Sequence, residues 1–116
     1  MIRDDGVYLA HILDALKQIS EYAGELDYET FRTMRMVQDA VIRQFEVMGE
    51  ATKNLSDGFR ARHAEVPWKD LAGFRDKLIH QYFGVDLSLV WRSVTDDVPL
   101  LLEELITIAQ GEKKAT

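Results

Sequence analysis

Apolar residues recur every three or four positions along almost the whole chain, and this periodicity constrains the fold more than any other feature. Such spacing places apolar side chains on one face of a helix, whereas a half-buried strand needs strict alternation of apolar and polar residues. No useful stretch alternates in this way, and the 116 residues contain only two prolines. The sequence therefore predicts an all-α bundle of about five helices around one core.

The first two predicted helices are long. One runs from near Asp4 to near Gly24, with acids at its start that suit the positive end of the helix dipole. The second is capped by Asp27, continues to about Leu55 and is expected to break near Thr33.

Gly49 lies inside this second helix, where glycine costs about 1 kcal/mol relative to alanine. We expect close approach of another backbone to compensate. After a turn at residues 56–58, a short basic helix should cover residues 59–64. Pro67 suits the first turn of the next helix, which should end between His80 and Phe83, before Gly84.

The last helix is capped by Asp86, and Pro99 should kink or split it. We expect one helical domain over residues 1–110 and a frayed tail over 111–116. Several apolar residues lie off the main apolar stripe of this helix, namely Leu89, Val90, Leu100, Leu102 and Ile106. They indicate either a homodimer surface or a helix that is well buried in a monomer.

Composition excludes some classes of protein. Without cysteine there are no disulfides and no thiolate metal sites, and the histidines and acids show no metal-ligand spacing. We predict no cofactor and no metal. The first residues lack the apolar run of a signal peptide, and no stretch reaches the roughly 20 apolar residues of a membrane span. We therefore expect a soluble, cytoplasmic protein that has no contact with a membrane.

Charge is distributed unevenly. The chain carries a formal net charge of −6, which argues against loose, nonspecific binding of nucleic acid. Residues 59–80 nevertheless hold five Lys/Arg and three acids. An acidic body with one locally basic segment suits a site for a specific phosphate group, although so small an excess can also arise by chance.

The stretch RDKLIHQY, residues 75–82, concentrates polar chemistry in this segment. On a helix, Asp76 and His80 would share one face, with Arg75 offset by about 100°. Arg75 can hold a phosphate and stabilise its developing charge, while His80 transfers protons as general acid or base. Tyr82 could orient the substrate or stack on a base, and an RNA 2′-hydroxyl could act as the nucleophile. Alternatively, these are solvated surface residues.

The wider sequence resembles the HepT-like branch of the HEPN superfamily. The stretch fits R-x4-H-x-Y, preceded by Pro67-Trp68 and followed by Val90-Trp91, and Gly49-Glu50-Ala51 matches the G-E-A of the family's long helix. The likeness covers about residues 4–108. His11 and His63 have no comparable polar neighbours in the sequence, and we expect them to be structural or exposed.

The resemblance implies a HEPN-type helical homodimer that acts as a ribonuclease toxin in a type VII toxin–antitoxin module. Its two motifs would face each other across the dimer and cleave RNA without a metal. Arg75 would bind phosphate, Asp76 would orient His80, and His80 would be the acid and base. Tyr82 would receive AMP from an MntA-type nucleotidyltransferase antitoxin, and Lys77 is a further candidate contact for RNA phosphate.

Two other functions fit the same sequence. The chain could be a non-catalytic helical subunit that binds nucleotide or substrate for a minimal nucleotidyltransferase. It could also be a plain dimeric scaffold.

Overall fold

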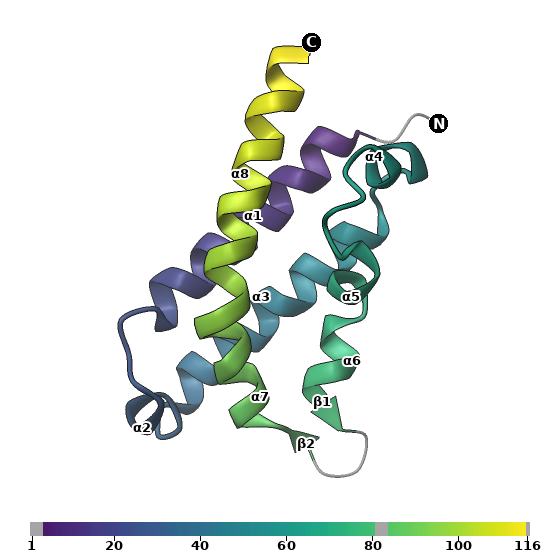
Figure 1. Ribbon diagram of the computed structural model, residues 1–116. Helices are drawn as coiled ribbons and strands as arrows, with labels where there is room; N and C mark the ends of the chain where they lie inside the picture. Colours follow the sequence, from purple (N-terminus) through teal and green to yellow (C-terminus); the bar gives the residue numbers. More distant parts are fainter. Residues whose placement is uncertain (1–3, 81–83, 116) are drawn as a thin grey trace.

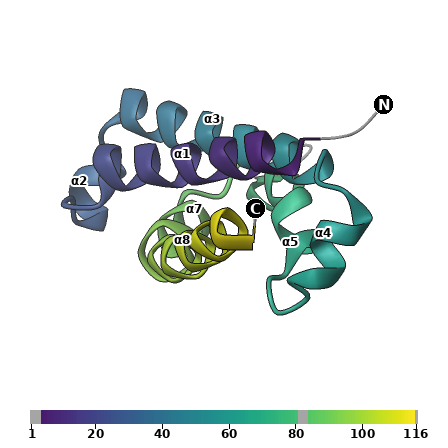
Figure 2. The ribbon, with the colours of Figure 1, turned by 90° about the horizontal axis from the view of Figure 1, so that it is seen from above.

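The computed structural model describes residues 4–80 and 84–115 (Figure 1). Regular structure in these residues is helical apart from one two-residue ladder, which confirms the all-α prediction. Figure 2 shows two layers, with α1 (Asp5–Ala23) and α3 (Arg35–Lys53) side by side in one of them. α8 (Val98–Ala115) and the short helices α4 (Asp57–Arg62) and α5 (Trp68–Ala72) form the other.

The first layer forms where the sequence predicts it. Asp4 caps α1 by accepting a hydrogen bond from the Val7 amide at 3.2 Å. Asp27 caps the four-residue α2 (Tyr28–Phe31) in the same way. The helix then breaks between Phe31 and Arg35, where α3 begins. Behind the break, the buried Gln38 amide donates to the Phe31 carbonyl at 3.0 Å, which satisfies both groups in the interior.

A single core joins the layers. α1 contributes Leu9, Ile12, Leu16 and Ile19, α3 contributes Val41, Phe45 and Met48, and α8 contributes Val98, Leu101, Leu105 and Ile108. The shorter elements add Phe59, Trp68, Leu71, Phe74 and Leu78. These are the residues whose three- and four-residue spacing predicted the helices, so the apolar stripes face one another.

Gly49 is buried where α3 meets α5. A Cβ atom at this position would lie 3.3 Å from the Ala72 carbonyl oxygen and 3.4 Å from that of Leu71. The predicted close approach of another backbone is therefore confirmed, and it fixes the spacing between α3 and α5.

The segment after α5 differs from the prediction. Instead of one helix from Pro67 to about His80, α5 ends at Gly73 and a separate five-residue α6 covers Phe74–Leu78. β1 (Ile79–His80) then pairs antiparallel with β2 (Gly84–Val85), with His80 opposite Gly84. Gly84 has a φ of 77°, a backbone conformation that favours glycine. A glycine break and a short ladder thus replace the last turns of the predicted helix.

A change in helix geometry interrupts the C-terminal helical run just before Pro99. α7 (Leu87–Arg92), capped by Asp86, leads into a π-helical turn over Ser93–Asp97 and then into α8. The Val98 amide donates to the Ser93 carbonyl, five residues back. Proline at position 99 has no N–H, and the wider turn before it accommodates that loss.

α8 continues through Gly111–Ala115, the residues for which the sequence predicts a frayed tail. Glu112 Oε1 accepts a hydrogen bond from Arg62 Nη2 at 3.1 Å and lies 2.7 Å from His63 Nε2. These contacts tie the last turns of α8 to α4. No helix in the described ranges has the length and hydropathy needed to cross a bilayer.

Candidate functional site

Arg75 lies in the first turn of α6 and faces α3. Its Nε donates to Glu46 Oε2 at 3.3 Å, and 57% of its side chain is exposed. Asp76 Oδ1 is 4.0 Å from Arg75 Nη1, and its side chain is 87% exposed. The guanidinium is thus held from one side by α3 and remains accessible to a ligand.

A groove surrounds this arginine. It has a volume of about 240 Å³ and lies between α3 and the α5–α6 segment. Its lining consists of Arg43, Glu46, Gly49, Glu50, Lys53, Ala72, Arg75 and Asp76. Three of these side chains are cationic and three are acidic, so the groove is electrically balanced rather than basic.

The structure brings only part of the predicted site together. Arg75 and Asp76 are adjacent to the groove, and Lys77 is exposed one position further along α6. Lys77 makes no hydrogen bond or ion pair with any side chain in residues 4–80 and 84–115. Its ammonium is therefore available to an external anion.

The side chains of His80 and Tyr82 lie outside the part of the chain that the structure describes. The His80 backbone belongs to β1, whereas no part of Tyr82 is described. The prediction that Asp76 and His80 share a helix face is wrong, because α6 ends at Leu78. Whether Asp76 orients His80 stays a prediction.

Glu46 is a site residue that the sequence analysis missed. It lies one turn before Gly49 on α3, so it belongs to the helix face that contacts α5 and α6. Gly49 was the sequence signal that could have identified Glu46. A glycine inside a helix indicates that this helix face touches another backbone, and polar residues on the same face then lie against that segment too.

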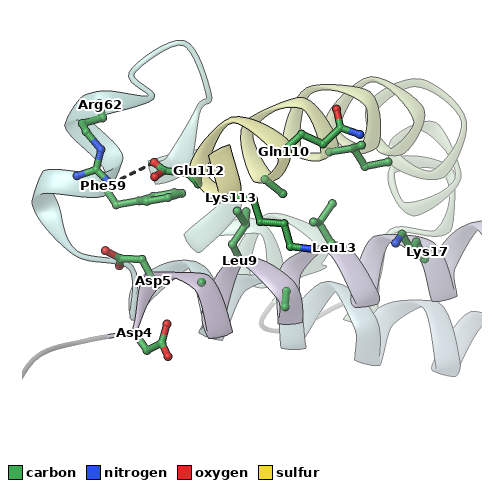
Figure 3. Close-up of a pocket in the computed structure, with 14 residues that line it drawn as sticks. Asp4, Asp5, Leu9, Leu13, Lys17, Phe59, Arg62, Gln110, Glu112 and Lys113 are labelled. Atoms are coloured by element: carbon green, nitrogen blue, oxygen red, sulfur yellow. Dashed lines mark hydrogen bonds and ion pairs between the residues drawn. The ribbon is translucent and has the colours of Figure 1, made fainter. Parts of the chain in front are cut away.

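A larger hollow lies elsewhere in the molecule. It measures about 570 Å³, lies between α1, α4 and α8, and is lined chiefly by apolar side chains such as Leu9, Leu13 and Phe59 (Figure 3). None of the predicted site residues lines it. The predicted residues Arg75 and Asp76 instead line the smaller polar groove.

Of the other histidines, His63 is half-buried beside Glu112, whereas His11 is exposed. Hydrogen bonding from His63, followed by hydrogen bonding from Arg62, lowers the pKa of Glu112 from its ordinary value of 4.5. This cluster joins α4 to α8 and has no contact with the groove around Arg75, so we assign it a structural role.

Comparison with known families gives one extensive match. The family described as "Ribonuclease HepT-like" matches residues 12–108, a range that includes every predicted site residue.

Several curated proteins are similar over most of the chain. A "Probable ribonuclease HepT" of Thermococcus cleftensis is 44% identical over 101 residues, which cover 87% of this chain and 92% of that protein. A "Putative RNase" of Caldanaerobacter subterraneus is 41% identical over 91% of this chain and 95% of its own length.

A third relative is longer. It is described as "Gamma-glutamylcyclotransferase and putative RNase", comes from Methanocaldococcus jannaschii, and is 46% identical over 95% of this chain. The chain spans only 50% of that protein's length. No solved structure matches.

Proposed function

Because this chain belongs to the HepT-like ribonuclease family, we propose that it is a metal-independent endoribonuclease that uses Arg75 and His80. In this mechanism the 2′-hydroxyl of RNA attacks the adjacent phosphorus, and the bond to the 5′-oxygen of the next nucleotide breaks. His80 accepts the proton of the attacking hydroxyl or donates one to the leaving oxygen. Arg75 stabilises the charge on the phosphate oxygens. The products carry a 2′,3′-cyclic phosphate and a 5′-hydroxyl.

The accessibility of Arg75 is the observation that carries this proposal. Its guanidinium lies at a groove, is more than half exposed, and is held in place by Glu46 at 3.3 Å. An exposed guanidinium at a groove can reach the phosphate of an external ligand and donate two hydrogen bonds to it. The next residues along the chain hold the remaining groups of the R-x4-H-x-Y motif.

Homodimerisation is part of the proposal, with two motifs forming one cleft. α8 exposes 69% of Leu100 and 37% of Ile106, two of the off-stripe residues that indicated a partner surface. They are candidates for a surface that a second subunit would cover, since apolar patches mark protein–protein contacts. Val90, in contrast, is buried within the chain and does not support a dimer.

We further propose that the protein is a toxin neutralised by AMP transfer from an MntA-type nucleotidyltransferase to Tyr82. AMP would add bulk and negative charge two residues from His80. It would obstruct the groove and compete with RNA phosphate for Arg75. Lys77, which has no ion partner among the described side chains, would be a second attachment point for RNA.

The first experiment tests cleavage. Purified protein should cut single-stranded RNA in the presence of a chelator and leave 2′,3′-cyclic phosphate ends. His80→Ala and Arg75→Ala should each lower the rate by at least about 100-fold, the usual contribution of such groups. Arg92→Ala, a change at an exposed arginine outside the groove, should not alter the rate. If His80→Ala cleaves as fast as the wild type, the activity does not come from this site. The nucleotide-binding subunit would then be the better interpretation.

The second experiment tests the modification. Wild-type protein incubated with the antitoxin and ATP should gain the mass of AMP and lose RNase activity, whereas Tyr82→Phe should keep its activity. A Tyr82→Phe protein that is still modified and inactivated would place the AMP elsewhere. Tyr8, Tyr22 and Tyr28 are the other tyrosines in the chain.

A further inference from the structure

A second hollow adjoins the groove around Arg75, on the opposite side of α3. It has a volume of about 230 Å³ and lies between α1 and α3. Arg43, Glu46 and Glu50 line both hollows, so the two lie on either side of this row of side chains on α3. The groove around Arg75 has a predicted reaction centre, whereas nothing has been assigned to the second hollow.

Arg43 lies between the two hollows and is exposed. Its acidic neighbours already have cationic partners, since Glu46 binds Arg75 and Glu50 Oε1 lies 3.4 Å from Lys53 Nζ. Arg43 itself makes no hydrogen bond or ion pair with the rest of the described chain. Its guanidinium is therefore free to bind an external anion, and its planar donors suit a phosphate.

Two aromatic rings line the second hollow. Tyr8 and His11 extend from α1, and their rings meet edge to face with centroids 6.2 Å apart. Tyr8 is half-buried against the core, which limits its motion, and His11 is exposed. A partly fixed ring beside a free arginine is a typical combination for single-stranded nucleic acid, because the arginine binds a phosphate while a base stacks on the ring.

We propose that Arg43 and Tyr8 form an RNA subsite next to the scissile phosphate, with His11 supporting the Tyr8 ring. Arg43 binds a neighbouring phosphate and Tyr8 stacks on the base of that nucleotide. This inference rests on the proposed RNase function, because it concerns the hollow next to the same groove. An acidic peptide would also meet Arg43, but it would make no use of the aromatic rings.

Binding is measured with a fluorescently labelled single-stranded RNA of about 12 nucleotides, within the usual range for such sites. The His80→Ala background prevents cleavage during the measurement. Arg43→Ala should weaken binding and lower the slope of log affinity against log salt by about 0.7, the value for one phosphate contact on a single strand. Tyr8→Ala should weaken binding about fivefold or more, whereas Tyr8→Phe should bind as the parent does. Arg92→Ala is the matched arginine control.

Cleavage of two substrates locates the contact. With His80 intact, Arg43→Ala should lose more activity on the long RNA than on a dinucleoside monophosphate, which offers no neighbouring phosphate. Thermal melting checks that the Tyr8 variants are folded. If Tyr8→Ala does not fold, Arg43→Ala still tests the subsite, because Arg43 is exposed and its loss should not disturb the fold.

The failure of the subsite can be distinguished from failure of the RNase. If wild type cleaves RNA and Arg43→Ala keeps the affinity and salt slope of its parent, the subsite is refuted and the RNase stands. Equal losses on the long and short substrates also refute it. If wild type neither binds nor cleaves RNA, both proposals fail.

Discussion

The α1–α3 pair and the segment from α5 to β2 touch along α3, but they acquire their structure in different ways. α1 and α3 have 19 residues each, with apolar stripes that face each other. α5 and α6 have five residues each, far fewer than the roughly 12–15 at which an isolated helix becomes even marginally stable. The segment that contains Arg75 therefore depends on the helix pair for its shape. Three kinds of contact join the pair and α8 to the shorter elements, and each can be broken separately.

The apolar contact should matter most. Phe45 on α3 is 1% exposed and stacks on Phe74 of α6, with ring centroids 4.7 Å apart. Phe45→Ala should lower the free energy of unfolding by about 3–5 kcal/mol, because it removes the ring and leaves a cavity. Urea unfolding followed by circular dichroism measures the loss. Lys77→Ala, an exposed change on the same segment, should stay within about 0.5 kcal/mol of wild type. A loss below about 1 kcal/mol for Phe45→Ala would show that α6 does not depend on this packing.

The backbone contact should come second. Gly49→Val would force branched carbons against the Leu71 and Ala72 carbonyls and should destabilise the protein by about 1–3 kcal/mol. Gly111→Ala is the control, since a Cβ at Gly111 meets nothing within 4 Å and should stabilise α8 by up to about 1 kcal/mol. Thermal unfolding of both variants measures these changes in stability. A Gly49→Val protein as stable as the wild type would mean that α5 moves away from α3 at no cost.

The polar contact should be the weakest, and it should depend on pH. The folded state lowers the Glu112 pKa, so this carboxylate stabilises the protein above its ordinary value of 4.5 and loses that effect as pH falls below it. Glu112→Gln should therefore cost at most about 1 kcal/mol near neutral pH, with a smaller cost in acid. Melting temperatures recorded from neutral to acidic pH measure this difference. Glu103→Gln, on the solvent side of α8, should show no such trend, and a cost for Glu112→Gln that grows in acid would reverse our assignment.

The sequence predicted the long helices well because their signals are local. The helix start near Asp4, the caps at Asp27 and Asp86 and the break near Thr33 each depend on a few neighbouring residues, and the structure has them all. The division at Gly73 and the turn to extended backbone at Ile79 could not be predicted in this way. Those depend on packing against α3 and on pairing with β2, which join residues that are distant in the sequence or follow a turn.

The candidate site shows the same distinction. The residue types and spacing of the motif identified Arg75, whose exposure at a groove agrees with a role in binding. Its ion partner Glu46 is 29 residues away, and spacing gives no direct indication of such a pair. The continuation of α8 to Ala115 also involves distant residues, because Glu112 is held by residues about 50 positions earlier in the chain.

The π-helical turn over Ser93–Asp97 also affects how the C-terminal run opens. Its hydrogen bonds close wider rings, and Pro99 has no amide to donate to the preceding turn. Helices usually begin to unravel at their termini, but here a weak point is fixed in the middle of a continuous run. Deuterium should therefore enter the amides around Thr95 sooner than those of the buried turns on either side.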